Sequence, residues 1–440
     1  MNGRRKVLDL FDEQKDFVNE RVAYGIENYR KGDAKITVTD ENGKPIPNAR
    51  IKVKQKSHEF RFGANLFMLE ELETSEKNEA YKKYFRDVFN MATLPFYWDA
   101  LEPERGLPRY AKDSPKVYRR PAPDLCMEFC EEHGIEPREH ALAYERHFPT
   151  WLYDASIEEV KAELERRYAE ISERYGDKIP TIEVTNEMEW DTGRTSFYDQ
   201  PDYVEWCFKL AEKYFPQNQL CINDHSELCW ADKCRATDKY YAYVEANMLK
   251  GARIDAIGMQ YHLFYRREDE YKRTRLLLNP EKLYGHMDLY SNLGKPLQIT
   301  EVTVPSYSWN ADDEEIQSEI IEKLYTIWFS HPSVEQIIYW NLVDGYANGA
   351  KPGDMTVGEN YYHGGLIRFD MTPKPAFLKL KELLEERWHT EAELVTDQNG
   401  NAEFRGFYGD YTADVAVNGQ VLTTKLSLSK ASENSIDIVL

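Results

Sequence analysis

The chain has 440 residues, of which 56 are Lys or Arg and 77 are Asp or Glu, so its formal net charge is −21 at pH 7. This acidity argues against nucleic acid or an anionic membrane as a partner, because binding to phosphate groups requires clustered basic side chains. The length and the hydrophobic content of 42% predict one large domain with a sizeable core and a smaller accessory domain.

The first 33 residues are predicted to form an N-terminal helix. Apolar side chains recur at nearly helical spacing from Val7 to Ile26, and Lys31-Gly32 is a typical helix stop. The charged start contains no apolar core of a signal peptide, and no run in the sequence is long enough to span a bilayer. We therefore expect a cytoplasmic protein, or a secreted one if a leader has been removed.

The pattern then changes to alternating apolar and polar residues. Residues 34–39 and 49–54 are predicted to be two strands of a hairpin with one buried face, joined by a turn at residues 40–48.

Strands and helices alternate eight times between residues 60 and 387. The expected strands are residues 60–66, 94–98, 138–144, 181–186, 219–223, 254–261, 297–302 and 336–342, and helical segments separate most of them. Eight such units favour an α/β fold with a closed parallel (β/α)8 barrel, a TIM barrel, over an open doubly wound sheet. A last helix at residues 374–387 would close the barrel.

After Trp388 the sequence returns to short alternating strands. They are expected at residues 392–396, 402–407, 412–417, 421–426 and 435–439, with hairpin turns at Asn399-Gly400 and Asn418-Gly419. A single thin layer of this kind cannot bury one face alone. We therefore expect residues 34–59 and 388–440 to form one accessory β-sandwich, which either braces the barrel or binds polysaccharide.

Two glutamates end buried strands of the predicted barrel. Glu187 ends the run 179–187, and Glu301 ends the run 296–301. Active sites of such barrels form at the carboxyl ends of the strands. Two facing carboxylates can cleave a glycosidic bond, because one protonates the leaving oxygen while the other attacks or stabilises the anomeric carbon. Helix capping or ion pairing is the alternative role for each glutamate alone.

Short motifs follow one another along the barrel in a characteristic order. They are residues 89–90, 98–106, 133–135, 138–140, 149–152, 186–187, 223–224, 257–262, 299–301, 339–340, 344–345 and 373–376. Each motif is short, but their joint order and spacing resemble glycoside hydrolase family 10, the retaining endo-β-1,4-xylanase family. The resemblance covers roughly residues 60–384.

This resemblance implies the chemistry of the site. Glu187 would be the general acid/base and Glu301 the nucleophile of a double displacement on xylan or xylo-oligosaccharides, with Asn223 behind them. No cofactor is expected. A metal site is not expected either, because the histidines lack ligand spacing and the six cysteines form no Cys-x-x-Cys framework with His spacing.

Further side chains near the glutamates are expected to contact the sugar. Asn186 can donate to the 2-hydroxyl, a contact that strengthens in the transition state. Gln260 and His262 share one face of a strand, and the resemblance places His262 near the nucleophile, where it can orient and tune the carboxylate. His140 matches a histidine of the family, and Trp340 is expected to stack on a sugar ring. Structural roles in the barrel core or on the backbone are the alternatives.

The sequence departs from the family at positions that bind substrate. Tyr97 stands where the family has a lysine that grips the sugar, and Tyr144-Glu145 replace a Trp-His pair, with His147 two residues further on. Thr303, two residues after the nucleophile, replaces an aspartate. Since Glu145 would add a negative charge near the cleft, we expect substrates that carry uronic acids to be disfavoured.

These departures keep two alternatives open. One is a related retaining β-glycosidase for a different β-linked or decorated oligosaccharide. The other is a carbohydrate-binding protein without activity, although the presence of both glutamates argues against it. The sequence leaves the oligomeric state and the choice between endo and exo action undetermined.

Overall fold

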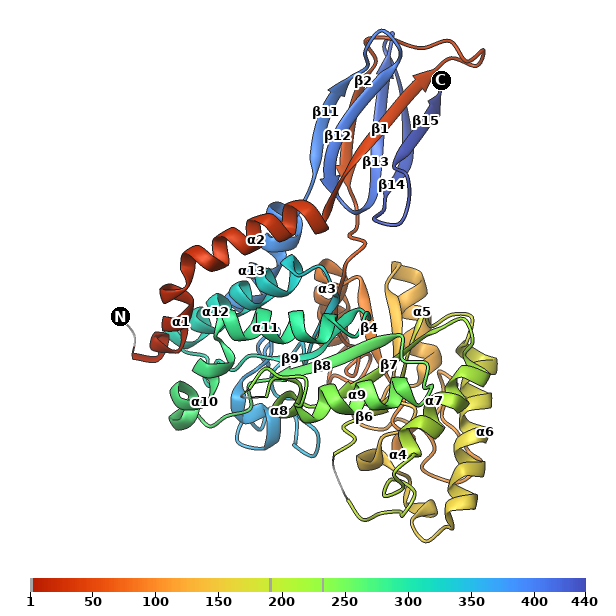
Figure 1. Cartoon of the computed structure of the whole chain (residues 1–440), viewed down its shortest axis with the longest axis vertical. Coiled ribbons are helices and arrows are strands. Elements are labelled where there is room, and N and C mark those ends of the chain that lie inside the picture. The colour runs from red at the N-terminus through yellow and green to blue at the C-terminus, as the bar shows by residue number, and fades with distance from the viewer. Residues whose placement is uncertain (1–2, 190–191, 232) are drawn as a thin grey trace.

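The computed structural model describes residues 3–189, 192–231 and 233–440, and it consists of a barrel with a β-sandwich attached to one end (Figure 1). Eight strands close the barrel in the order β10-β3-β4-β5-β6-β7-β8-β9, and all neighbours are parallel. Their bounds are β3 (Arg61–Asn65), β4 (Met91–Pro95), β5 (Glu136–His140), β6 (Thr181–Asn186), β7 (Gln219–Asp224), β8 (Ala256–His262), β9 (Leu297–Thr303) and β10 (Val334–Tyr339). The predicted (β/α)8 barrel is confirmed.

Helices cover the outside of the barrel (Figure 1). The longer ones are α3 (Ser75–Val88), α5 (Pro123–His133), α6 (Ile157–Tyr175), α7 (Tyr203–Tyr214), α9 (Lys239–Leu249), α10 (Glu270–Leu277), α11 (Pro280–Ser291), α12 (Ala311–Ser330) and α13 (Pro375–Glu382). Short helical turns in the loops are α4 (Trp98–Leu101), α8 (Ser226–Cys229), η2 (Glu145–His147), η3 (Thr150–Leu152), η4 (Arg267–Asp269) and η5 (Gly358–Tyr362), and η6 (Leu383–Arg387) follows α13.

Local sequence signals set the ends of several helices. The Ser156 side chain accepts from the backbone N–H of Glu159 at the start of α6, and Asn310 caps α12 in the same way. Helix α5 ends at Gly134, whose φ of 64° is the left-handed conformation that glycine adopts without a steric penalty. These signals fix where each helix returns the chain to the next strand.

Strand β6, which Glu187 follows, and strand β9, which contains Glu301, are buried at every position. This is expected for parallel strands with helices on one face and a filled barrel interior on the other. The strand predicted at residues 94–98 is displaced, because β4 ends at Pro95 and Trp98 begins α4. All five residues are buried, so apolar character does not distinguish the strand from the helical turn that follows it.

The accessory unit contains two sheets, and each combines strands from both ends of the chain. In one sheet β1 (Lys31–Thr39) lies between β12 (Asn401–Phe407) and β15 (Ser435–Val439). The other has the order β11 (Glu391–Val395), β2 (Arg50–Gln55), β13 (Gly409–Val417), β14 (Gln420–Leu428). The alternating burial along β2 turns one face of the sheet inward. The predicted β-sandwich from N- and C-terminal segments is confirmed.

Two of the predicted hairpins are wrong. β1 and β2 belong to different sheets, and so do β11 and β12 on either side of Asn399-Gly400. Alternating polarity specifies which face of a strand is buried, but it does not specify the partner strand. The segment between β1 and β2 and the segment between β11 and β12 both pass from one sheet to the other, and they lie side by side. The Thr396 hydroxyl links them, since it donates to the Ile46 carbonyl and accepts from the Ala49 amide. The turn at Asn418-Gly419 does form a hairpin, between β13 and β14.

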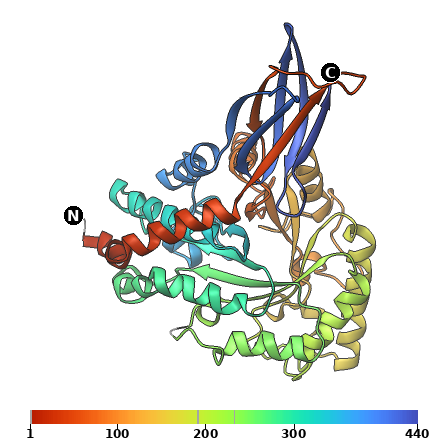
Figure 2. The same cartoon turned by 45° about the horizontal axis from the view of Figure 1, so that its top comes forward.

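The N-terminal segment forms η1 (Gly3–Leu8), α1 (Asp9–Glu13) and α2 (Lys15–Tyr29), and α2 packs along α12 on the outside of the barrel (Figures 1 and 2). A Cβ at Gly25 would lie 2.1 Å from the Ser330 carbonyl oxygen, so only glycine permits this close approach. We propose that the chain divides into residues 1–33, residues 34–59 with 388–440, and the barrel at residues 60–387.

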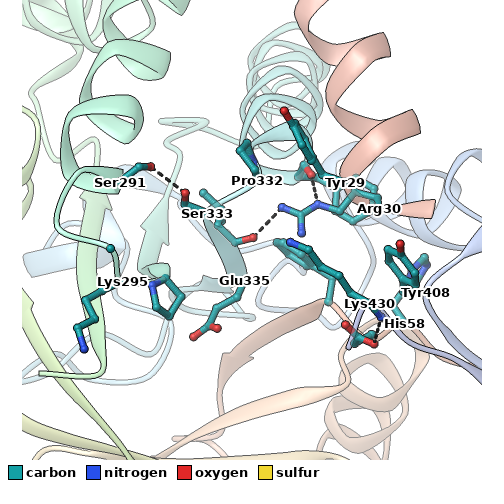
Figure 3. Close-up of a pocket in the computed structure, with 16 residues that line it drawn as sticks. Tyr29, Arg30, His58, Ser291, Lys295, Pro332, Ser333, Glu335, Tyr408 and Lys430 are labelled. Atoms are coloured by element: carbon teal, nitrogen blue, oxygen red, sulfur yellow. Dashed lines mark hydrogen bonds between the residues drawn. The ribbon is translucent and has the colours of Figure 1, made fainter. Parts of the chain in front are cut away.

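Arg30 fastens the segment between α2 and β1 to the barrel. Its guanidinium donates to the main-chain carbonyls of Phe329 and Val334, the latter at 2.7 Å (Figure 3). It also donates to the carbonyl of His331. It lines a cavity of about 410 Å³ between the sandwich and the amino-terminal ends of the barrel strands. The sandwich therefore lies at the end of the barrel opposite to the carboxyl ends of the strands.

Replacing Arg30 with methionine is expected to lower the free energy of unfolding by about 3 kcal/mol, because three buried carbonyls lose a charged donor. The midpoint of urea unfolding measures this loss. Arg50→Met, at an exposed position of β2, is the matched control and should leave the midpoint unchanged. Equal midpoints for the two variants would contradict the fastening role of Arg30.

Two further features of the chain concern its cysteines and possible membrane spans. All six cysteines are free, and five of them are buried. Across residues 3–189, 192–231 and 233–440, no helix is both long enough and apolar enough to cross a bilayer.

Candidate active site

A cleft of about 480 Å³ opens at the carboxyl ends of the barrel strands. Seven of the predicted site residues line it: Tyr97, Asn186, Glu187, Gln260, His262, Glu301 and Trp340. The rest of its lining consists of Phe67, Arg119, Arg120, Tyr144, Arg146, His147, Arg194, His225, Ser226, Glu227, Phe264, Asn348 and Glu359. The structure thus brings together side chains from β6, β8 and β9 and from the segments that follow the other barrel strands.

One amide connects the two glutamates. Gln260 Nε2 donates to Glu187 Oε1 at 3.1 Å and to Glu301 Oε1 at 3.0 Å. Because one nitrogen bonds both oxygens, these oxygens lie within about 6 Å of each other. This upper limit is compatible with the ~5–5.5 Å between carboxyl groups of retaining glycosidases and lies below the ~6.5–9.5 Å of inverting ones.

Glu301 is buried and held by amides and a histidine. Besides Gln260, Asn223 Nδ2 approaches Glu301 Oε1 at 3.4 Å, and His262 Nε2 lies 3.1 Å from Oε2. Burial raises the pKa of Glu301 above its ordinary value, while the hydrogen bond from His262 acts in the opposite direction. The carboxylate is therefore fixed in orientation and poorly solvated, as a nucleophile requires.

The protons of His262 follow from its two partners. The Thr303 hydroxyl donates to the Trp340 carbonyl at 2.5 Å, so at 2.9 Å it accepts from His262 Nδ1. Nε2 then faces the Glu301 carboxylate at 3.1 Å, so the Thr303 contact orients the ring toward the candidate nucleophile.

Glu187 follows β6 in the left-handed conformation, with φ of 49°. A residue with a side chain occupies this region only when its surroundings fix it, and such residues cluster at active sites. Its amide donates to the Asn223 carbonyl at 3.1 Å, and the Tyr144 hydroxyl donates to Oε2 at 2.6 Å. Arg146 Nη1 lies 3.5 Å from the same oxygen. These contacts aim the carboxylate into the cleft.

Asn186 presents its amide nitrogen to the cleft. Its Oδ1 accepts from Asn223 Nδ2 at 3.0 Å and lies 3.3 Å from Gln260 Nε2. The Thr300 hydroxyl donates to Asn223 Oδ1 at 2.7 Å, which fixes the orientation of the Asn223 amide behind the glutamates. Within the described part of the chain Asn186 Nδ2 has no acceptor, so this donor is available to a hydroxyl of a bound sugar.

A buried charged layer that sequence reasoning missed lies beneath the glutamates. Glu183 accepts from Arg138 and is 2.8 Å from His140 Nδ1, while His140 Nε2 is 2.8 Å from the Tyr97 hydroxyl. Burial opposes the ionised form of Glu183, but His140 and Arg138 outweigh it and lower its pKa to about 2. His140 thus lies behind the cleft. The signal was present in the sequence as the charged run that forms β5 and as a single glutamate inside β6.

The same layer contains the best candidate for a metal site. Ligand atoms of His140, Glu183 and Glu301 lie within 4.8 Å of one another. Arg138 already places a cation on Glu183, and both nitrogens of His140 have hydrogen-bond partners. The donor set therefore fits a hydrogen-bonded network better than a divalent ion.

Aromatic rings form the wall of the cleft beside β4 and β10. The ring of Tyr97 stacks on His147 at 3.9 Å, and His147 Nδ1 lies 3.0 Å from an Asp99 oxygen. Trp340 is 5% exposed and packs edge-on against Phe67 with a centroid distance of 4.9 Å. Burial raises the pKa of Tyr97 well above its ordinary value, so the position where the family has a lysine is neutral here.

Glu145 does not reach the cleft, which corrects its predicted role in substrate binding. Its carboxylate is buried and accepts from the amide and the hydroxyl of Thr192, the hydroxyl at 2.7 Å. The expectation rested on the family position that Glu145 occupies, and Glu145 belongs here to the short η2 turn, which directs its side chain to Thr192. The expected repulsion of uronic acids by Glu145 therefore loses its structural basis.

Comparison with known proteins shows the family of the chain. A sequence profile described as Glycosyl hydrolase family 10 matches residues 54–382. Among curated proteins, Anti-sigma-I factor RsgI6 of Acetivibrio thermocellus is 27% identical over 410 residues, which cover 92% of this chain and 47% of that protein. Endo-1,4-beta-xylanase 2 of Arabidopsis thaliana is 24% identical over 409 residues, which cover 90% of this chain and 33% of that protein. The chain thus spans less than half the length of these curated relatives.

Solved structures share the fold. Xylanase 10B from Thermotoga petrophila RKU-1, in complex with xylobiose, superposes with a TM-score of 0.58 at 23% identity, over 75% of this chain and 95% of that one. The profile match covers well over half of the 440 residues. The chain therefore belongs to glycosyl hydrolase family 10.

Proposed function

We propose that this protein is a retaining glycoside hydrolase that cleaves β-1,4-linked xylan or xylo-oligosaccharides. The observation that carries the proposal is the amide of Gln260, which bonds one oxygen of Glu187 and one of Glu301 and so limits their separation. Relatives that are named endo-1,4-beta-xylanases support the choice of substrate.

The reaction would proceed in two displacements. Ionised Glu301 attacks the anomeric carbon from one face while protonated Glu187 gives its proton to the departing glycosidic oxygen. Glu187, now ionised, then removes a proton from water, which attacks the same carbon and releases Glu301. Asn186 would donate to the 2-hydroxyl of the sugar at the reaction centre in both steps.

His262 is expected to set the acid limb of the pH profile. Its hydrogen bond lowers the pKa of Glu301, so His262→Phe should raise that pKa and move the acid limb of kcat/KM upward by about one pH unit. The measurement is kcat/KM between pH 4 and pH 9 on an aryl β-xyloside. His133→Phe at the end of α5, on the far side of the barrel, is the matched control. An unchanged limb, or one at lower pH, would contradict this role.

The substrate is tested with unbranched β-1,4-xylo-oligosaccharides and a panel of aryl β-glycosides. Turnover of the xylosides by the wild type, lost in Glu301→Ala, is the expected result. Turnover of a different glycoside alone would keep the mechanism and replace the substrate. Binding without any turnover would favour the alternative of a carbohydrate-binding protein.

The β-sandwich is proposed to brace the barrel. It lies at the amino-terminal ends of the barrel strands, away from the cleft, and its junction with the barrel is tied by Arg30 (Figure 3). Phe404 and Tyr411 are buried inside it, so neither ring can stack on polysaccharide from the surface.

A further inference from the structure

We propose that the cleft contains a subsite for a sugar carboxylate at Arg119 and Arg120, so that oligosaccharides carrying a uronic acid are preferred over neutral ones. The inference rests on the proposed function, because it concerns the substrate of the same cleft. It reverses the expectation that was based on Glu145.

Arg120 is a buried cation that faces the cleft without an acidic partner. It is 6% exposed, and its guanidinium carbon lies 4.1 Å from the ring centroid of Tyr97 and 5.0 Å from that of Phe67. Nη1 donates to the Arg119 carbonyl at 2.9 Å. In residues 3–189, 192–231 and 233–440 no carboxylate lies within 4.0 Å of it. Its other N–H groups are therefore available to a ligand that enters the cleft.

A buried guanidinium of this kind is costly for the empty protein. Burial lowers the pKa of Arg120 to about 10, because the charged form loses its hydration without gaining an ion pair. A carboxylate that accepts from two guanidinium nitrogens would supply the missing anion in a site sheltered from water. Binding of such a ligand would then offset the desolvation free energy of the buried guanidinium.

Arg119 adds a second positive charge with only weak compensation. Nη2 donates to Asn341 Oδ1 at 2.9 Å, and Nη1 lies 3.8 Å from Glu359, whose carboxylate also accepts from Asn341. Arg119 Nε is buried with no hydrogen-bond partner. The two arginines carry two positive charges, and the one carboxylate beside them carries a single negative charge. This side of the cleft is therefore locally positive, although the chain as a whole has a net charge of −21.

The position of this pair links it to the sugar at the reaction centre. Tyr97, beneath Arg120, bonds His140, and Phe67 packs on Trp340, so the arginines flank the glutamates on the side of β3, β4 and β10. Arg194, also in the cleft, lies elsewhere and donates to the carbonyls of Glu145 and Arg146. A uronic acid on the sugar nearest β4 would reach Arg120.

The test measures binding to the full chain carrying Glu301→Gln, which should not consume the substrate. The three probes are a xylo-oligosaccharide with one glucuronic acid branch, the same compound as its methyl ester, and the unbranched backbone. Calorimetry is expected to show the free acid binding at least about tenfold more tightly than the ester, which keeps the shape but lacks the charge. Equal affinities for acid and ester would overturn the subsite.

A second variant locates the effect. Arg120→Met, added to the same background and checked for an unchanged melting temperature, should remove the preference for the acid and leave the affinity for the ester unaltered. Arg194→Met should keep the preference, and loss of the preference there instead would overturn the assignment to Arg120. Hydrolysis of the unbranched backbone by the wild type reports separately on the proposed function, so the two can fail independently.

Discussion

Replacing Glu301 with alanine is expected to lower kcat on xylo-oligosaccharides by about 10⁵-fold, as removal of a covalent nucleophile does in other enzymes. The carboxylate is buried and fixed by Gln260 and His262, and no other carboxylate contacts these two side chains except Glu187 within the residues that the structure describes. The other nearby carboxylate, Glu183, is fully buried and paired with Arg138, so we do not expect it to replace Glu301.

Adding azide tests whether the lost activity of Glu301→Ala is due to the missing nucleophile. In Glu301→Ala a small anion can enter from the face that the carboxylate vacates, so an activated aryl β-xyloside should give the α-xylosyl azide after one inversion. Glu403→Ala, on an exposed position of β12, is the control and should retain full activity. Residual activity of Glu301→Ala within tenfold of the wild type would contradict the nucleophile assignment.

Glu187→Gln is expected to affect substrates according to their leaving group. Hydrolysis of xylo-oligosaccharides should fall by about 10²–10⁴-fold, because the departing sugar oxygen needs a proton. A dinitrophenyl xyloside needs no proton on its leaving group, so its first displacement should proceed at nearly the wild-type rate and the covalent intermediate should accumulate. Rapid-quench measurements of the two steps separate these effects.

Azide again distinguishes the two glutamates. In Glu187→Ala it would attack the covalent intermediate and give the β-xylosyl azide, the opposite anomer to that from Glu301→Ala. An equal loss of rate for sugar and dinitrophenyl leaving groups would show that Glu187 is not the proton donor.

Much of the fold was readable from the sequence, because burial on both faces leaves a strong signal in parallel strands. Strand β6 was predicted with its observed bounds, and all eight barrel strands were located within a few residues. The partners of β1 and β11 were not readable, since alternating polarity identifies a buried face but not the strand beside it. That choice depends on packing between segments more than 300 residues apart.

The candidate site was likewise predicted in part from the sequence and in part seen only in the folded structure. Glu187 and Glu301 were found because each ends an apolar run in the sequence, and in the structure both accept a hydrogen bond from the amide of Gln260. Glu145 was misplaced because its position in the family pattern does not specify where its side chain points, and the η2 turn directs it to Thr192. Arg119 and Arg120 were missed because they come from a loop without periodicity, where only the folded chain shows what a side chain faces.

The most direct test of the central claim is the anomeric configuration of the first product released from xylohexaose, followed by proton NMR before mutarotation. A double displacement through Glu301 predicts the β-anomer, with net retention. Initial appearance of the α-anomer would show a single displacement by water and would contradict the assignment of Glu301 as nucleophile.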